Sequence, residues 1–316
     1  MKTITFEDIK ALNIDAQTYY DWIDFPLRNR DKFTLPTKVK IPMVGDDYCN
    51  IMPCAFPDGN VLGLKVINRN ENRRNDGRIN LDSQILLYSY ETCDLLCVMD
   101  GNYITTMRTA AVAVHTIINM VEDYSTIAMV GLGNMAPAIG DMLFQLTKDK
   151  EYTVKLMQYK GQENRFINRF KEYKNVTFKV CDSQDVLMKD SDLIVSSVTN
   201  AEKDFCDESI YKPGCTIIPV HMKGFMECDL TFDNIVVSDL IRAKSFKYYD
   251  QYKRLLYTDD VLNGTVNLRN SSTDRTLIYN LGLAITDMYY AAKIYQMMDM
   301  KETPEIKLGT DDKFYV

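Results

Sequence analysis

Hydrophobic and polar residues alternate in short runs between residues 30 and 100. Stretches such as "VLGLKVINR" and "SQILLYSYETCDLLCVM" are rich in β-branched and aromatic residues, and "PDGN" and "YETCD" interrupt them. Runs of this kind separated by turn-forming residues predict strands joined in hairpins, so we expect an antiparallel sheet here. Ahead of this region, "TITFEDIKAL" predicts a short strand and then a helix capped near Thr5.

From residue 125 onward, short apolar segments alternate with helical ones. Six segments predict strands: "STIAMVGLG", "YTVKLMQY", "VTFKVCD", "DLIVSSVT", "CTIIPVHM" and "NIVVSD". Three segments between them predict helices: "NMAPAIGDMLFQLTKD", "QENRFINRFKEYKN" and "SQDVLMKDS". Strands that alternate with helices at this spacing indicate a parallel, doubly wound sheet of the Rossmann type.

Two longer helices are predicted outside that pattern. One is "RTAAVAVHTIINMV" over residues 108–121, and the other runs from about Leu283 in "TLIYNLGLAITDMYYAAKIYQMM". Because the last helix follows the end of the doubly wound pattern, we expect it to return to the first domain. The predicted fold class is therefore α/β, with a central Rossmann domain over residues 121–282 and a discontinuous α+β domain over residues 1–120 and 283–316.

Composition narrows the classes of partner. The 316 residues carry a formal net charge of −7, which argues against nucleic acid and anionic membranes as partners. No apolar run reaches the roughly 18 residues of a membrane span, and "MKTITFEDIKALN" lacks the apolar core of a signal peptide, so we expect a cytoplasmic protein. The eight cysteines form no Cys-x-x-Cys pair and there are two histidines, so we expect reduced thiols and no metal site.

The segment "VGLGNMA" follows a predicted buried strand and opens a predicted helix. Gly131, Gly133 and Ala136 fit the pattern G-x-G-x-x-G/A. In this pattern the first glycine allows a tight turn, the second lets the backbone approach a pyrophosphate, and the third small residue lets helix and strand pack closely. The helix N-terminus at Asn134 and Met135 offers N–H groups to a phosphate. We expect a dinucleotide here; the alternative is a tight strand-to-helix turn without a ligand.

The end of the second predicted strand bears on which dinucleotide binds. Many NAD-binding proteins place an acidic residue there for the ribose 2′-OH, whereas this chain has Gln158, Tyr159 and Lys160. Gln158 can hydrogen-bond a ribose, and Lys160 can meet a 2′-phosphate or lie in solvent. The expected cofactor is NADP(H) or NAD(H), with Lys160 favouring NADP(H).

Two cationic residues stand in apolar surroundings. Lys65 lies in an otherwise apolar strand, where its ammonium group can bind a substrate carboxylate, or act as an acid once burial lowers its pKa. On an edge strand it would instead extend to water. Arg108 is predicted at the start of a helix, where its guanidinium group can pair with a carboxylate or lie on the surface.

Five segments together resemble the ornithine cyclodeaminase/mu-crystallin family. They are "LGLKVINRNENRR", "GRINLDSQILLYSYET", "VMDGNYITTMRTAAVAVHT", "VGLGNMA" and "NLGLAITD", spread over residues 60–290. The most specific piece is "DGNYITTMRTAA". The resemblance implies a two-domain NAD(P)-dependent enzyme, usually a homodimer, whose first domain binds substrate and forms the dimer and whose Rossmann domain binds the cofactor.

The resemblance also implies roles for individual residues. Lys65 and Arg108 match a lysine and an arginine that bind the substrate carboxylate, and Leu281 matches a position that touches substrate. Arg108, Thr109 and Thr199 match family residues near the cofactor. Val220, His221 and Met222 follow the fifth predicted strand and are expected beside the nicotinamide. A family threonine near the cofactor falls near Asn80, where this chain departs from the pattern.

This chain departs from the family pattern in its charges. An ungapped alignment puts Lys223 where the cyclodeaminase has an aspartate for the second amine of ornithine, although Glu227 and Asp229 are close enough in sequence to replace it. The family's early arginine falls near Lys38 or Lys40. A protonated lysine repels an ammonium group. These changes therefore favour a substrate with more than one carboxylate, or an α-keto or imino acid, over ornithine.

Together these observations predict an imine reductase, or an amino-acid or opine-type dehydrogenase. Such an enzyme transfers a hydride at the nitrogen-bearing carbon of an amino or imino acid, and Lys65 or Lys223 would supply or relay the proton. Two other functions remain open. One is an ornithine cyclodeaminase that makes proline and ammonia, and the other is a non-catalytic, crystallin-like protein that binds NADPH and a ligand.

Overall fold

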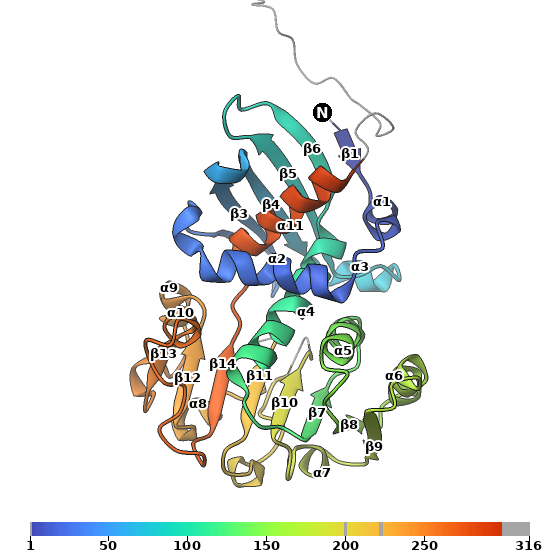
Figure 1. Ribbon diagram of the computed structural model, residues 1–316, viewed down its shortest axis with the longest axis vertical. Coiled ribbons are helices and arrows are strands. Elements are labelled where there is room, and N and C mark those ends of the chain that lie inside the picture. Colours follow the sequence, from blue (N-terminus) through green and yellow to red (C-terminus); the bar gives the residue numbers. More distant parts are fainter. Residues whose placement is uncertain (1, 199–200, 221–223, 299–316) are drawn as a thin grey trace, which may run out of the picture. The chain divides into compact units, whose positions relative to one another are not determined.

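The chain folds into two compact units, each assembled from separate stretches of sequence (Figure 1). A computed structural model describes residues 2–198, 201–220 and 224–298. Unit 1 comprises Met1–Asp15, Phe25–Arg108 and Leu283–Val316, and unit 2 comprises Ala16–Asp24 and Thr109–Gly282.

Unit 1 is built on a six-stranded sheet in the order β1-β6-β5-β4-β3-β2. Its strands are β1 (Lys2–Ile4), β2 (Val39–Pro42), β3 (Tyr48–Phe56), β4 (Val61–Arg69), β5 (Leu81–Ser89) and β6 (Leu95–Asp100). All neighbours pair antiparallel except β1, which pairs in parallel with β6. The predicted antiparallel sheet is therefore confirmed, and β1 extends it by a parallel strand.

Helix α11 (Ala284–Met297) lies across this sheet and contacts β3, β4 and β5 (Figure 1). Alternate residues of β3 and β5 are buried, which is the two-residue period of a strand with one covered face. Gly63 in β4 lets the helix approach, because a Cβ atom there would lie 2.3 Å from the Leu86 carbonyl oxygen and 2.9 Å from Met288 Sδ. The core of unit 1 lies between this sheet face and α11.

The first helix of unit 1 starts at a capping box, as its sequence predicts. Thr5 Oγ1 accepts a hydrogen bond from the Asp8 backbone N–H, and the Asp8 carboxylate accepts one from the Thr5 backbone N–H. The helices that lie wholly in this unit are α1 (Phe6–Ala11), α3 (Asn72–Asn75) and α11.

Two helices contribute residues to both units: α2 (Ala16–Arg28) and α4 (Gly101–Met120). The sequence pattern did not predict α2. The prediction that the next helix begins at Arg108 is wrong, because it begins at Gly101. Asp100 accepts a hydrogen bond from the Tyr103 backbone N–H at 2.8 Å and so caps the helix at this earlier point.

Residues 109–120 belong to unit 2, which differs from the expected domain boundary at residue 120. Their contacts explain this. His115 Nε2 lies 2.8 Å from Asp24 Oδ1, and Asn119 Nδ2 donates to the Tyr20 hydroxyl at 2.8 Å. The Thr116 hydroxyl also hydrogen-bonds the Asn280 side chain. This half of α4 is therefore held by residues of unit 2.

Unit 2 contains an eight-stranded sheet in the order β13-β12-β14-β11-β10-β7-β8-β9. Its strands are β7 (Thr126–Val130), β8 (Tyr152–Met157), β9 (Val176–Cys181), β10 (Leu193–Ser196), β11 (Thr216–Pro219), β12 (Asn234–Val237), β13 (Leu255–Tyr257) and β14 (Thr276–Tyr279). All neighbouring strands are parallel. β10, β11, β12 and β14 are buried along their whole length, as in a parallel sheet with both faces covered.

The helices that lie wholly in unit 2 are α5 (Met135–Leu146), α6 (Gln162–Phe170), α7 (Gln184–Met188), α8 (Cys228–Thr231), α9 (Leu240–Ala243) and α10 (Thr258–Leu262). The predicted Rossmann-type fold is confirmed, with strands at the six predicted segments. β13 and β14 were not predicted, and β14 enters the sheet between β11 and β12. None of the described helices is long and apolar enough to cross a membrane.

The close approach at Gly63 predicts that replacement with alanine destabilises unit 1. The added methyl group meets the backbone of Leu86, which cannot move aside without disturbing the β4–β5 pairing. We expect Gly63→Ala to lower the free energy of unfolding by about 1–3 kcal/mol. Gly133→Ala, where a Cβ atom has no neighbour within 4 Å, should leave it unchanged. Urea denaturation measures both, and equal midpoints for the two variants would contradict the prediction.

Candidate functional site

Three charged side chains meet in the interior of unit 1: Lys65 from β4, Arg108 from α4 and Asp287 from α11. Lys65 Nζ lies 2.6 Å from Asp287 Oδ1, and Arg108 Nε donates to the same oxygen at 3.0 Å. The side chains of Lys65 and Asp287 are fully buried, and that of Arg108 is 10% exposed. Because these residues are far apart in sequence, the cluster exists only in the folded unit.

Two cations share one carboxylate in this cluster, so it has an excess positive charge when Lys65 is protonated. Burial lowers the pKa of Lys65 to about 7; Asp287 opposes this shift, and the charges of Arg108 and Lys38 add to it. Asp287 Oδ2 is buried without a hydrogen-bond partner among the residues that the structure describes. The cluster can therefore accept a further anion beside its cations, and it offers a free oxygen to an N–H group.

The position of Lys65 follows from the pairing of the central strands. It pairs with Met52 of β3 on one side and with Ile85 of β5 on the other, and both partners are buried. Its Nζ also lies 3.4 Å from Thr105 Oγ1 on α4. On this interior strand Lys65 does not extend to water, so the edge-strand alternative does not apply.

Lys38 and Lys40, the other predicted substrate-binding lysines, lie at the edge of the same sheet. Lys40 is in β2, opposite Asn50 of β3; it is exposed, with Nζ 5.3 Å from the centre of the Tyr48 ring. Lys38 immediately precedes β2, and its charge acts on the pKa of Lys65. Contact of either lysine with substrate remains a prediction.

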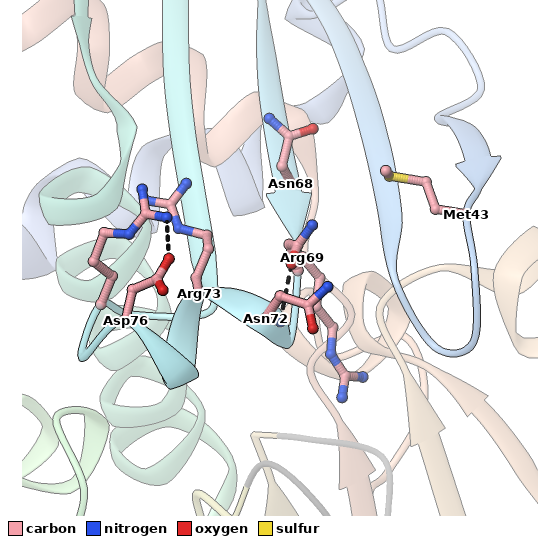
Figure 2. A pocket seen from close by; sticks show the side chains of 8 residues that line it. Met43, Asn68, Arg69, Asn72, Arg73 and Asp76 are labelled. Carbon is pink, nitrogen blue, oxygen red and sulfur yellow. Dashed lines mark hydrogen bonds and ion pairs between the residues drawn. The ribbon is translucent and has the colours of Figure 1, made fainter.

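A cavity of about 460 Å³ lies at the end of β4 in unit 1 (Figure 2). Its lining includes three described arginines, and each forms an ion pair with a carboxylate: Arg69 with Glu71, Arg73 with Asp82, and Arg78 with Asp76. Asn80, predicted near the cofactor, donates to Glu71 Oε1 at 2.9 Å beside this cavity's Arg69. The described arginines are neutralised locally, so we assign no ligand to the cavity.

In unit 2, the glycine turn between β7 and α5 depends on the missing side chain of Gly131. This residue has φ of +80°, and a Cβ atom there would lie 2.7 Å from Val198 Cγ2. The Ser197 hydroxyl donates to the Gly131 carbonyl oxygen at 2.6 Å and fixes the turn against the end of β10. Gly131 is therefore required by the turn itself, whether or not a ligand binds.

Gly133, in contrast, faces open space, since a Cβ atom there would have no neighbour within 4 Å. Asn134 makes no side-chain capping hydrogen bond to α5, and the first turn of this helix has no acidic residue. Met135 is the first residue of α5 and Ala136 is fully buried. Uncapped N–H groups, the positive end of a helix dipole and open space beside a glycine together fit a pyrophosphate.

The loop after β8 carries the residues predicted to contact the adenosine ribose. Lys160 has φ of +51° and its Nζ lies 5.0 Å from the centre of the exposed Tyr159 ring. The buried Glu163 accepts a hydrogen bond from the Tyr159 backbone N–H at 3.0 Å and so holds the loop. Gln158 donates its own backbone N–H to Cys181, and its side chain remains a predicted ribose contact.

The remaining predicted positions divide into three groups. Thr109 lies within α4 rather than at its start. A helix N-terminus therefore does not support the predicted contact of Thr109 with the cofactor phosphates. Leu281 is 5% exposed in the hydrophobic core of unit 2, and Val220 follows β11 with partial exposure. Four positions lie outside the described residues, and their roles remain predictions: Thr199, His221, Met222 and Lys223.

The two acids named as substitutes for the family aspartate differ in their surroundings. Asp229 Oδ1 accepts a hydrogen bond from the Tyr279 hydroxyl at 2.8 Å, and burial raises the pKa of Asp229 to about 7. Glu227 accepts a hydrogen bond from the Tyr248 hydroxyl at the surface. The raised pKa lets Asp229 change its protonation near neutral pH.

Sequence reasoning missed Asp287 and Thr105 as members of the cluster around Lys65. Asp287 ends the segment "GLAITD", and Thr105 lies in "DGNYITTMRTAA". Both segments contribute to the family resemblance, so the signal for these residues was present in the sequence. What the sequence did not reveal is that both residues contact the same lysine.

The folds of the two units define a class of protein. A doubly wound parallel sheet with a glycine turn after its first strand, together with a second unit that buries a lysine–arginine–aspartate cluster, is the architecture of a two-domain Rossmann-type protein. The chain belongs to the ornithine cyclodeaminase/mu-crystallin family, whose sequence model matches residues 5–302. The predicted family is thereby confirmed.

Several known proteins align with nearly the whole chain at low sequence identity. The Nodulation efficiency protein NfeD of Rhizobium meliloti is 24% identical over 320 residues, 98% of each chain. The Thermococcus litoralis Delta(1)-pyrroline-2-carboxylate reductase, solved with NADH and L-proline, superposes with a TM-score of 0.77 at 18% identity, over 94% of this chain and 97% of that one. The iminosuccinate reductase of Paracoccus denitrificans, solved with NAD+, gives 0.79 at 17% identity, over 98% and 99%.

The contrast between the two glycines predicts separable effects on binding and stability. Gly133→Val places a branched side chain where we expect the pyrophosphate, so the dissociation constant for NADH or NADPH should rise at least about tenfold with little change in stability. Gly131→Ala should instead lower stability, because of its positive φ and the contact with Val198. Fluorescence titration and urea denaturation measure the two quantities. Normal cofactor affinity in Gly133→Val would show that the turn binds no pyrophosphate.

Proposed function

We propose that this chain is an NAD(P)-dependent oxidoreductase that reduces the C=N bond of an imino acid, or oxidises the corresponding amino acid. The family membership and the two structural relatives, both reductases solved with a nicotinamide cofactor, support this reaction class. A homodimer, as the family resemblance implies, is part of the proposal.

The observation that carries this proposal is the charge imbalance of the buried cluster in unit 1. Asp287 Oδ1 is shared by Lys65 and Arg108, so one positive charge is not neutralised by a described neighbour. A substrate carboxylate would neutralise it, and Arg108, which uses Nε toward Asp287, has its terminal nitrogens to form a fork for that carboxylate. The free Asp287 Oδ2 can accept a hydrogen bond from the substrate's nitrogen.

Reduction of a C=N bond adds a hydride to carbon and a proton to nitrogen. The bound nicotinamide supplies the hydride. Lys65 fits the role of proton donor, because its pKa of about 7 lets it hold and release a proton near neutral pH. Lys223, the other predicted proton donor, remains an alternative for this role.

The residues that would hold the cofactor are those of the glycine turn and the loop after β8. The backbone at Gly131, Gly133, Asn134, Met135 and Ala136 would bind the pyrophosphate. Gln158, Tyr159 and Lys160 would face the ribose, where Lys160 favours NADP(H), although both structural relatives were solved with NAD(H). Thr199, Val220, His221 and Met222 would lie near the nicotinamide, as the family resemblance implies.

Turnover of defined substrates tests the proposed function. NADH or NADPH oxidation should occur with pyrroline-2-carboxylate, or with a keto acid plus an amine, and Arg108→Met should lower kcat/KM at least about a hundredfold because the carboxylate loses its bidentate partner. Arg169→Met, which removes a surface arginine paired with Asp141, is the matched control and should change nothing.

Two results would overturn this proposal. In the first, the wild type reduces neither an imino acid nor a mixture of a keto acid and an amine, but converts L-ornithine to proline and ammonia with NAD+. The chain would then be a cyclodeaminase. If it binds NADPH tightly and turns over none of these compounds, the chain is a binding protein.

The depressed pKa of Lys65 predicts the pH dependence of reduction. Lys65 is protonated below about pH 7, so kcat/KM for imine reduction should be constant there and fall up to tenfold per unit above it. In Lys65→Arg the guanidinium group stays charged, so the slower residual reaction should lose this descending limb. An identical limb in Lys65→Arg would assign the titration to another group.

A further inference from the structure

Asn50 of β3 has a buried amide group that the fold does not satisfy. The residue is 4% exposed, and its Oδ1 has no hydrogen-bond partner among the residues that the structure describes. An unpartnered buried amide costs about 1–3 kcal/mol. A buried polar side chain in this state requires a partner, and a ligand that supplies the missing hydrogen bond is one such partner.

The strand register places Asn50 beside the proposed carboxylate site. Met52 is opposite Lys65, so Asn50, two residues earlier on β3, is on the same sheet face and diagonal to Lys65. Diagonal neighbours on adjacent strands are about 7–8 Å apart. A substrate that is held at Lys65 by one end can therefore reach Asn50 with its other end.

The charges around Asn50 indicate what that other end is. Lys40 is directly opposite Asn50 on β2, and Lys38, whose charge acts on Lys65, immediately precedes this strand. Arg69, diagonal to Asn50 on the other side, is paired with Glu71. Because a 180° rotation of the terminal amide exchanges its oxygen and nitrogen, Asn50 can present N–H groups to an anion.

We propose that Asn50 and Lys40 bind a second carboxylate on the substrate, so that the enzyme acts on a dicarboxylic imino or amino acid of four or five carbons. This inference rests on the proposed function, in which Arg108 and Lys65 bind the first carboxylate. The Asn50 amide donates to the second carboxylate, and the Lys40 ammonium group neutralises it from the solvent side.

A comparison of two acids tests this subsite in the enzyme saturated with its oxidised cofactor. Calorimetry should show succinate binding at least about tenfold more tightly than butyrate, which has the same number of carbons and one carboxylate fewer. Asn50→Leu keeps the shape of the side chain without its amide. It should weaken succinate binding about tenfold to a hundredfold and change butyrate binding little.

Stability distinguishes a ligand site from a structural amide. With no ligand present, Asn50→Leu should raise the urea midpoint, because it removes an unsatisfied amide; a structural amide with an internal or water partner would give a lower midpoint. Asn68→Leu, the same change on the opposite face of β4, is the control and should leave the preference for succinate unchanged. Asn50→Asp replaces the amide with a carboxylate of nearly equal size, and it should also lose succinate binding. This variant replaces Asn50→Leu in the binding experiment if the leucine variant does not fold.

The two proposals fail in different ways. Four results would overturn the second carboxylate site. Two concern the wild type: equal affinity for succinate and butyrate, or no binding of either acid. Two concern Asn50→Leu: equal weakening of the binding of both acids, or a lower urea midpoint. The wild type would then still reduce pyrroline-2-carboxylate if the proposed function is right. If the subsite is right, kcat/KM for iminosuccinate should exceed that for pyrroline-2-carboxylate, and Asn50→Leu should remove the difference.

Discussion

The shared carboxylate of Asp287 is the interaction on which unit 1 depends. It pairs with two cations, Lys65 and Arg108, in a place where neither reaches water freely. Removal of one partner from a buried ion cluster costs about 3–5 kcal/mol, because the other charge is left uncompensated. A sheet strand, α4 and α11 are therefore tied together by charges that none of them could bury by itself. Gly63 allows this arrangement, since it lets α11 approach β4 closely enough for the contact.

The two units use different chemistry for the two parts of the proposed reaction. In the proposed reaction, unit 1 would discriminate among ligands by charge and by the number of carboxylates, because burial strengthens the interactions of its charged side chains. In the proposed reaction, unit 2 would bind the pyrophosphate through backbone N–H groups at the glycine turn, where Gly133 faces open space. Under this proposal, a change in charge in unit 1 would alter substrate choice, whereas added volume at the glycine turn would alter cofactor binding.

The charge of the whole chain and the charge of the cluster have opposite signs. The formal net charge is −7, which reduces association with nucleic acid, yet the buried cluster has one cation in excess when Lys65 is protonated. Buried charges are screened much less by salt than surface charges. A small carboxylate that enters the cluster therefore interacts with local cations far more strongly than with the distant acidic surface, so the acidic composition does not conflict with an anionic substrate.

The sequence by itself determined the family, the parallel sheet of unit 2, the antiparallel sheet of unit 1 and the glycine turn, because these depend on local periodicity and on short contiguous motifs. It did not determine the start of α4, which is set by the Asp100 cap, or the strand β14, which was not predicted. Only the tertiary structure showed that Lys65 and Arg108 share the Asp287 carboxylate, and that Asn50 Oδ1 has no hydrogen-bond partner among the described residues. These properties depend on which distant segments of the chain bury one another and on the low dielectric environment that this burial creates. No local pattern of residues encodes the burial or the environment.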